Sequence, residues 1–231
     1  MEGPTGTLQR AAVILDVFEG ADRLNLSQIV AATGLPRTSV HRALEQLVAL
    51  RWVYREGMDY QLGMRMIELG AAAAQQNALR RAALPSLRRL HQLTGCVVHL
   101  AVRDGSEAVY LEKVGGESAP LVRSRVGDRL PVTSSTIGKA LLALGDPTDV
   151  DCPELTRVRE LRLAYDPERC VKGFSCVAVP IGKIGGTEAA ALSVFGPADR
   201  VRDKRMMSSA QTAAAETWRR IYPHQNLISK F

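Results

Sequence analysis

The stretch that decides the fold is Asn25–Leu62, NLSQIVAATGLPRTSVHRALEQLVALRWVYREGMDYQL. Ser27 lies just before an apolar run and can cap a short helix through its hydroxyl group. Gly34 permits the left-handed backbone that ends a helix, and Pro36 fits the first turn of the next one. The pattern predicts two short helices joined by a tight turn.

The second helix, predicted from about Arg37 to Leu50, is two-sided. Its apolar side is formed by Val40, Leu44, Leu47 and Leu50, which recur at helical spacing. Its polar side holds the residues that we expect to contact DNA, namely Arg37, Thr38, Ser39, His41 and Arg42. Two arginines at the N-terminal end are typical of a recognition helix, because that end enters the major groove.

Two strand-like segments, Trp52–Tyr54 and Tyr60–Leu62, flank a loop that contains glycine and acidic residues. They predict a hairpin wing, with Arg55 placed to contact phosphate. Upstream, Thr7 is expected to cap a first helix whose inner face comprises Leu8, Ala11, Ala12, Leu15 and Phe18. Residues 1–62 therefore predict a winged helix-turn-helix domain that reads DNA, with a packing unit that has no DNA role as the alternative.

The net positive charge of the chain does not lie in this predicted DNA-binding head, residues 1–62. The whole chain has 30 basic and 24 acidic residues, for a net charge of +6, yet residues 1–62 hold six arginines against seven acids. Each phosphate that the protein neutralises releases only one counterion, and each release adds only a small part of the DNA affinity. A single copy of this domain is therefore expected to bind DNA weakly. Two copies on one DNA site are therefore predicted.

Composition argues against export and membrane insertion. The chain has 231 residues, of which 46% are hydrophobic, but no apolar run reaches the roughly 20 residues of a spanning helix. The N-terminus lacks the apolar core of a signal peptide. The four cysteines are expected to be free thiols in a reducing cytoplasm: Cys96, Cys152, Cys170 and Cys176.

The remainder of the chain predicts a connecting helix and a second domain. Residues 63–78 are alanine-rich and form either a dimer contact or a solvated spacer. Residues 79–231 predict an α+β domain with an antiparallel sheet covered by helices. Its first expected element is a helix from Leu79 to Gly95, with Leu84, Leu87, Leu90 and Leu93 on its apolar side. The others are strands at 96–102, 108–114, 121–126, 176–181 and 189–195, a helix that starts near Ile137, and a helix over 200–221.

Several motifs in this order resemble the IclR family of bacterial transcriptional regulators over nearly the whole chain. They are GLPRTSVHR at 34–42, YQLG at 60–63, LP at 130–131, GKALLA at 138–143, CVAVPI at 176–181 and ALSV at 191–194. The resemblance implies a GAF-like C-terminal domain that binds a small organic acid or an aromatic metabolite. It also implies a dimer or tetramer on a near-palindromic operator.

The resemblance also implies which residues contact the effector. They are Leu130, Thr136, Ile137, Asp166, Cys176 and Ser193. Free amides at the start of the helix near Ile137, with the hydroxyl groups of Ser134, Ser135 and Thr136, suit a carboxylate.

The chain departs from the family pattern in two places. Phe195 stands where members often have a second serine, which implies a larger, flatter or less oxygen-rich effector. The region 144–164 is shorter than usual and implies a more open pocket. The alternative is a constitutive dimeric DNA-binding protein whose C-terminal domain binds no effector.

Enzymatic and metal chemistry have little support. Cys96 and His99 are three apart on a predicted strand, so they point to opposite faces and cannot share one ion. Cys170 and Cys176, with His91 or His99 as a base, lie in no recognisable catalytic motif. The sequence predicts no catalysis, no metal and no cofactor.

Overall fold

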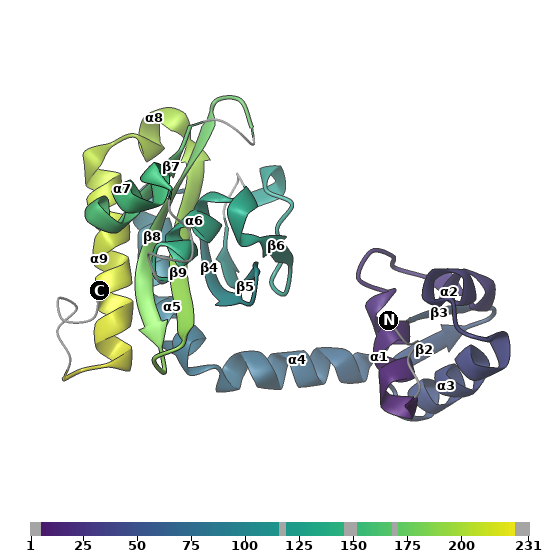
Figure 1. Cartoon of the computed structure of the whole chain (residues 1–231). Helices are drawn as coiled ribbons and strands as arrows, with labels where there is room; N and C mark the ends of the chain where they lie inside the picture. The colour runs from purple at the N-terminus through teal and green to yellow at the C-terminus, as the bar shows by residue number, and fades with distance from the viewer. Residues whose placement is uncertain (1–5, 116–118, 146–151, 168–170, 225–231) are drawn as a thin grey trace. The chain divides into compact units, whose positions relative to one another are not determined.

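The computed structural model describes residues 6–115, 119–145, 152–167 and 171–224 (Figure 1). The chain divides into two compact units, Met1–Ala74 and Gln75–Phe231. Helix α4 (Met64–Gln76) contains the division, and none of its residues is buried.

The first unit combines three helices with a three-stranded sheet. Its elements are α1 (Thr7–Asp16), β1 (Leu24–Asn25), α2 (Leu26–Thr33), α3 (Arg37–Ala49), β2 (Val53–Glu56) and β3 (Asp59–Leu62). The strands lie in the order β1-β3-β2, and all pairs are antiparallel. Ile14, Ile29, Val40 and Leu44 are fully buried at the centre of this unit. The helix-turn-helix and its wing are thus built on one small core.

The caps of the first helices differ from the prediction. Asn25, not Ser27, caps α2: its Oδ1 accepts from the Gln28 amide at 3.0 Å, and Gln28 Oε1 accepts from the Asn25 amide at 2.8 Å. This reciprocal pair satisfies two otherwise free amides. Likewise Gly6, not Thr7, precedes α1. Gly34 ends α2 with φ of 68°, as predicted.

Three predicted core residues of the first unit are exposed. Leu50 is 58% exposed because α3 ends at Ala49 and Arg51, with φ of 63°, turns the chain into the wing. Leu8 is 87% exposed in the first turn of α1, whose one buried residue is Ile14. The predicted face is therefore correct at Ala11, Leu15 and Phe18, which are buried or pack against the core, and wrong at Leu8 and Ala12.

The wing is a hairpin that leads directly into α4. Gly57 and Met58 form its turn, and Glu56 is opposite Asp59. Gly63 follows β3, and its amide donates to the Trp52 carbonyl at 2.7 Å. A Cβ at position 63 would lie 2.2 Å from the Arg51 carbonyl oxygen, so only glycine fits this close approach.

The second unit is a six-stranded sheet between two helical layers. Its strands are β4 (Val97–Asp104), β5 (Glu107–Val114), β6 (Arg129–Pro131), β7 (Ala164–Asp166), β8 (Phe174–Ile184) and β9 (Glu188–Pro197), in the antiparallel order β6-β5-β4-β9-β8-β7. Its helices are α5 (Ala78–Thr94), α6 (Thr136–Leu142), α7 (Pro153–Leu161), α8 (Ala198–Val201) and α9 (Lys204–Ile221), with 3-10 turns at Ala119–Leu121 and Val132–Ser134. The predicted α+β architecture is confirmed.

Side-chain alternation along the strands gives the sheet two different apolar faces. One face packs against α5 and α9, with Leu100, Leu192 and Trp218 in its core. The other face packs against α6 and α7, with Ala101, Ala191 and Ile137 in its core. We call this second surface the α6 face (Figure 1).

Three predictions for the second unit are wrong. Residues 122–126 form no strand, because Lys113 Nζ donates to the carbonyl oxygens of Val122 and Ser124 that a strand would need for pairing. The predicted helix over 200–221 is two helices, because Asp203 caps a new one by accepting from the Arg205 amide. Leu93, predicted on the inner side of α5, is 67% exposed.

Candidate nucleic-acid interface and effector face

The outer side of α3 presents the predicted DNA-contacting residues together. Arg37, Thr38 and Arg42 are exposed, and Ser39 and His41 are half-buried. Arg37 Nη1 donates to Ser27 Oγ of α2 at 3.2 Å, which links the two helices of the motif. His41 lies 3.6 Å from Glu45 one turn along. The first two turns of α3 are therefore a polar surface whose underside is the apolar core of the unit.

Arg55 lies on β2 of the wing and is exposed. Its Nε donates to the Gly57 carbonyl at 3.0 Å, and its guanidinium is 5.6 Å from the centre of the Tyr60 ring. These contacts hold the side chain along the hairpin. Its charge remains at the surface, where phosphate contact is possible.

On the α6 face, strand register brings most of the predicted effector residues into two neighbouring rows. Asp166, Cys176 and Phe195 form one row across β7, β8 and β9. Ser193 lies in the next row, between Ala178 on β8 and His99 on β4. Adjacent strands are about 4.8 Å apart, so neighbours within a row are close enough to bind one small molecule together.

Helix α6 places two further predicted residues over these rows. Thr136 is 5% exposed, and its hydroxyl donates to Asp166 Oδ2 at 3.5 Å. Ile137 is buried in the apolar core beneath the helix. Gly138 fits tightly, since a Cβ there would lie 2.0 Å from the Val132 carbonyl oxygen. The helix start is thereby fixed against the sheet.

The remaining predicted effector residues have other contacts. Leu130 lies on β6 at the sheet edge, opposite Ala108, and is exposed. The Ser135 hydroxyl accepts from the Gly138 amide at 3.1 Å, so it serves as the cap of α6. Phe195 stacks on Phe174, with ring centres 5.4 Å apart.

Two residues of the second row were not predicted as site residues. His99 is 3% exposed, its Nε2 is 2.8 Å from Ser124 Oγ, and its ring is 5.0 Å from that of Tyr110. Lys113, opposite His99 on β5, holds the segment 119–124 through its three hydrogen bonds to carbonyl oxygens. A single histidine inside an apolar strand was the only sequence signal for this cluster.

Burial keeps His99 neutral. Loss of solvation lowers the pKa of His99 from 6.5 to about 4, and the positive charge of Lys113 acts in the same direction. A neutral imidazole can both donate and accept a hydrogen bond. The row therefore combines a neutral aromatic side chain with the hydroxyl group of Ser193.

The described residues provide no metal site and no membrane span. No group of three or more potential metal-ligating His, Cys, Asp or Glu side chains comes together among them. None of their helices is long and apolar enough to cross a membrane. Cys96, Cys152 and Cys176 are free thiols, and Cys170 lies outside the described residues. Cys96 and His99 lie on opposite faces of the sheet, as predicted.

The fold defines a class of protein in which a winged helix-turn-helix is joined to a helix-covered sensor sheet. Comparison with known families agrees with this class. Residues 7–57 match the IclR helix-turn-helix domain, and residues 71–153 and 152–221 match the C-terminal domain of bacterial IclR transcriptional regulators.

Alignments with known relatives cover most of the chain. The chain is 33% identical to the HTH-type transcriptional regulator XynR of Escherichia coli K12 over 225 residues, which cover 87% of this chain and 89% of XynR. It is 30% identical to the HTH-type transcriptional repressor AllR of the same strain over 229 residues, 88% of this chain and 84% of AllR. The chain belongs to the IclR family of DNA-binding transcriptional regulators, which are not enzymes.

A solved structure gives the same result. The crystal structure of an IclR homologue from Microbacterium hydrocarbonoxydans, complexed with 4-hydroxybenzoate, has a TM-score of 0.79 and 25% identity to this chain. The match covers 94% of this chain and 99% of that one.

Proposed function

We propose that this regulator recognises a specific operator through the outer side of α3 and responds to a small hydroxylated or aromatic carboxylic acid on the α6 face. The observation that carries the proposal is that Asp166 and Ser193 lie on one sheet face, with Thr136 of α6 in contact with Asp166 and neutral His99 opposite Ser193. The proposed DNA contacts are Arg37, Thr38, Ser39, His41, Arg42 and Arg55.

The chemistry of the α6 face favours a ligand with two kinds of polar group. Ser193 offers a hydroxyl donor for a carboxylate, and the nearby charge of Lys113 lowers the cost of burying an anion. The Thr136 hydroxyl donates to Asp166 and thereby orients it. Asp166 is an acceptor that suits a ligand hydroxyl group. The rings of Phe174 and Phe195 provide an apolar wall. A hydroxybenzoate has a carboxylate, a hydroxyl group and an aromatic ring that match these three kinds of side chain, and the Microbacterium homologue is complexed with 4-hydroxybenzoate.

Ligand binding is tested by thermal shift with 4-hydroxybenzoate, benzoate, pyruvate and an uncharged phenol. A true effector at 100 times its dissociation constant stabilises the protein by about 2.7 kcal/mol. We expect S193A and T136V to remove this shift, whereas S208A, an exposed hydroxyl on α9, leaves it intact. If none of the acids shifts the unfolding transition, the constitutive DNA-binding alternative replaces the effector proposal.

Operator recognition is tested by selecting genomic fragments with the purified protein and then measuring base substitutions in the enriched sequence. If Arg42 reads a guanine edge, R42A costs about 1–3 kcal/mol and relaxes specificity at one position of each half-site. R157A on α7 is the matched control. An equal loss on every sequence indicates phosphate contact and contradicts base reading by Arg42.

The proposed response acts through a homo-oligomer. Helix α4 exposes Met64 and Ile67, both more than 60% accessible, and presents small residues at Gly70, Ala71 and Ala74. Such a side allows close approach of the same helix in a second copy. Effector binding then favours one arrangement of paired helices, which changes the spacing of the two heads, provided that the two states bind effector with different affinities. Light scattering with and without the effector tests the assembly.

A further inference from the structure

The positive charge of this DNA-binding protein lies in its second unit. Residues 1–74 contain seven arginines and eight acidic residues, which leaves 23 basic and 16 acidic residues for residues 75–231. DNA affinity depends strongly on the number of phosphates that a protein neutralises. The excess of cations outside the recognition head therefore calls for a structural explanation.

Much of the excess lies on the helical layer formed by α5 and α9. Helix α5 contains Arg80, Arg81, Arg88 and Arg89 and no acidic residue. Helix α9 contains Lys204, Arg205, Arg219 and Arg220, with Glu216 as its single acid. Both helices pack on the same sheet face, so their outer sides share one surface.

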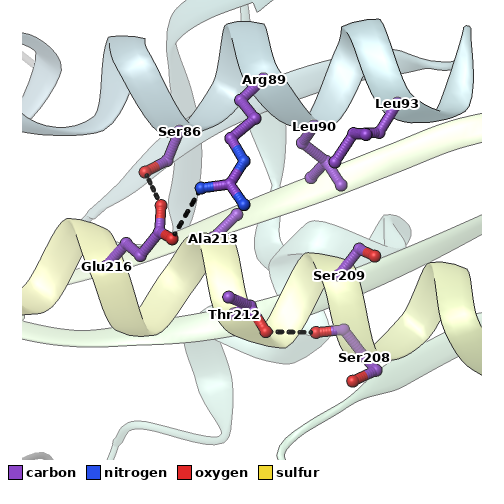
Figure 2. Close-up of a pocket in the computed structure, with 9 residues that line it drawn as sticks. All are labelled: Ser86, Arg89, Leu90, Leu93, Ser208, Ser209, Thr212, Ala213 and Glu216. Carbon is purple, nitrogen blue, oxygen red and sulfur yellow. Dashed lines mark hydrogen bonds and ion pairs between the residues drawn. The ribbon is translucent and has the colours of Figure 1, made fainter.

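The two helices run antiparallel and enclose a groove. Ser86 near the middle of α5 contacts Glu216 in the second half of α9, and Leu93 near the end of α5 borders the same cavity as Ser209 near the start of α9. The cavity has a volume of about 210 Å³ (Figure 2). Leu93 and Ser209 also line a second cavity of about 420 Å³, which Arg200 and Arg205 border.

The acid in this groove is already neutralised. Glu216 accepts from the Ser86 hydroxyl at 2.9 Å and from Arg89 at 3.3 Å (Figure 2). Arg220 lies 3.9 Å from the same carboxylate. In contrast, other exposed cations of the layer form no ion pair within the described residues. These are Arg81 and Arg88 on α5, and Lys204, Arg205 and Arg219 on α9.

The spacing of these cations suits a long polyanion. At 1.5 Å per residue, Arg81 and Arg88 are about 10 Å apart along α5, and Arg205 and Arg219 are about 21 Å apart along α9. Duplex DNA carries one negative charge for about every 1.7 Å of its axis, so such a surface faces several phosphates at once. Hydroxyl groups such as those of Ser208 and Thr212 along the groove are also common phosphate contacts.

We propose that the surface of α5 and α9, which we call the basic helical layer, binds the phosphate backbone of DNA independently of sequence. It supplies the electrostatic affinity that the neutral head lacks. Because this contact has no base readout, it strengthens operator and non-operator binding alike and makes both sensitive to salt. The proposal is independent of the effector.

The test measures binding of the full-length protein to a labelled duplex of mixed sequence, by fluorescence anisotropy at salt concentrations from about 50 to 200 mM. The variant R88Q/R205Q removes two cations of the layer. The control R157Q/K172Q removes two exposed cations that lie on α7 and just before β8. In the layer variant we expect the slope of log affinity against log salt to become shallower by about 1 for each phosphate that is no longer neutralised. The control variant is expected to keep the slope of the unmodified protein.

Three results overturn the proposal. An unchanged slope in R88Q/R205Q means that the basic helical layer does not contact DNA. An acidic protein is then the binding partner that remains for this surface. An equal change in R157Q/K172Q means that net charge alone is responsible. A change of oligomeric mass in the layer variant, measured by light scattering, means that the surface contacts a second copy of the chain.

Discussion

Protonation of His99 is expected to destabilise the second unit in mild acid. The pKa of His99 is lowered from 6.5 to about 4, first by burial and then by Lys113. At pH values above 6.5 the imidazole is neutral in both the folded and the unfolded chain, so the full stability is present. As the pH falls from 6.5 to about 4, the unfolded chain gains a proton that the folded chain does not bind, and stability is lost.

The expected loss follows from the size of the shift. One pKa unit corresponds to about 1.36 kcal/mol, so a change from 6.5 to about 4 gives a loss of about 3 kcal/mol. Below a pH of about 4 the folded state also binds the proton, and this contribution stops changing. A loss of this size is a large fraction of the roughly 5–15 kcal/mol that is typical of a whole domain.

The assay compares the chain with an H99Q variant, in which glutamine can bond to Ser124 but cannot titrate. Urea unfolding is followed by the fluorescence of Trp218 in a W52F background, where it is the only tryptophan. The protein concentration is held constant, because the stability of an oligomer depends on it. Carboxylates titrate equally in both proteins, so the difference between them isolates His99.

Parallel stability curves for the two proteins between about pH 7 and pH 4 contradict the reasoning. They would mean that the folded protein accommodates a charged His99, either by opening the segment 119–124 or by solvation of the imidazole. A difference that grows as the pH falls below 6.5 and levels off near pH 4 supports it.

Three predictions concern the first unit. Replacing Gly63 with alanine is expected to shift the wing relative to the start of α4 and to weaken DNA binding, because the new Cβ meets the Arg51 carbonyl oxygen at 2.2 Å. The shift is expected to change amide hydrogen exchange near residue 63, and unchanged exchange contradicts the prediction. N25A is expected to lower the free energy of unfolding by about 1 kcal/mol, since it removes the cap that pairs with Gln28. If S27A lowers the stability and N25A does not, Ser27 is the cap and the prediction is wrong. L44A is expected to cost about 2–5 kcal/mol, because Leu44 is fully buried, and a cost below about 1 kcal/mol in urea unfolding contradicts its place in the core.

Local patterns were sufficient to predict the main elements of both units. The turn at Gly34 and the apolar spacing of Val40, Leu44 and Leu47 act within a few residues, so they predict the two helices of the reading motif. The hairpin of β4 and β5 was equally predictable, because its strands are long and its turn residues are local. The order of motifs along the whole chain then identified the family.

Short elements and helix phases could not be predicted in the same way. Strands β6 and β7 have only three residues each, and they exist because an existing strand pairs with them rather than because of their own propensity. The segment 122–126 has the composition of a strand, yet Lys113 binds its carbonyl groups. Leu8 was misplaced because the buried side of a helix depends on what packs against it, and Leu50 because α3 ends one residue before it.

The sequence by itself determined the family, the order of the main elements and the polar outer side of α3, because these depend on local spacing along the chain. Only the tertiary structure decided that Asp166, Ser193 and His99 share one sheet face, because strand register joins residues far apart in sequence. It also decided that the cations of α5 and α9 form one surface, since the packing of two distant helices against one sheet brings their charges together.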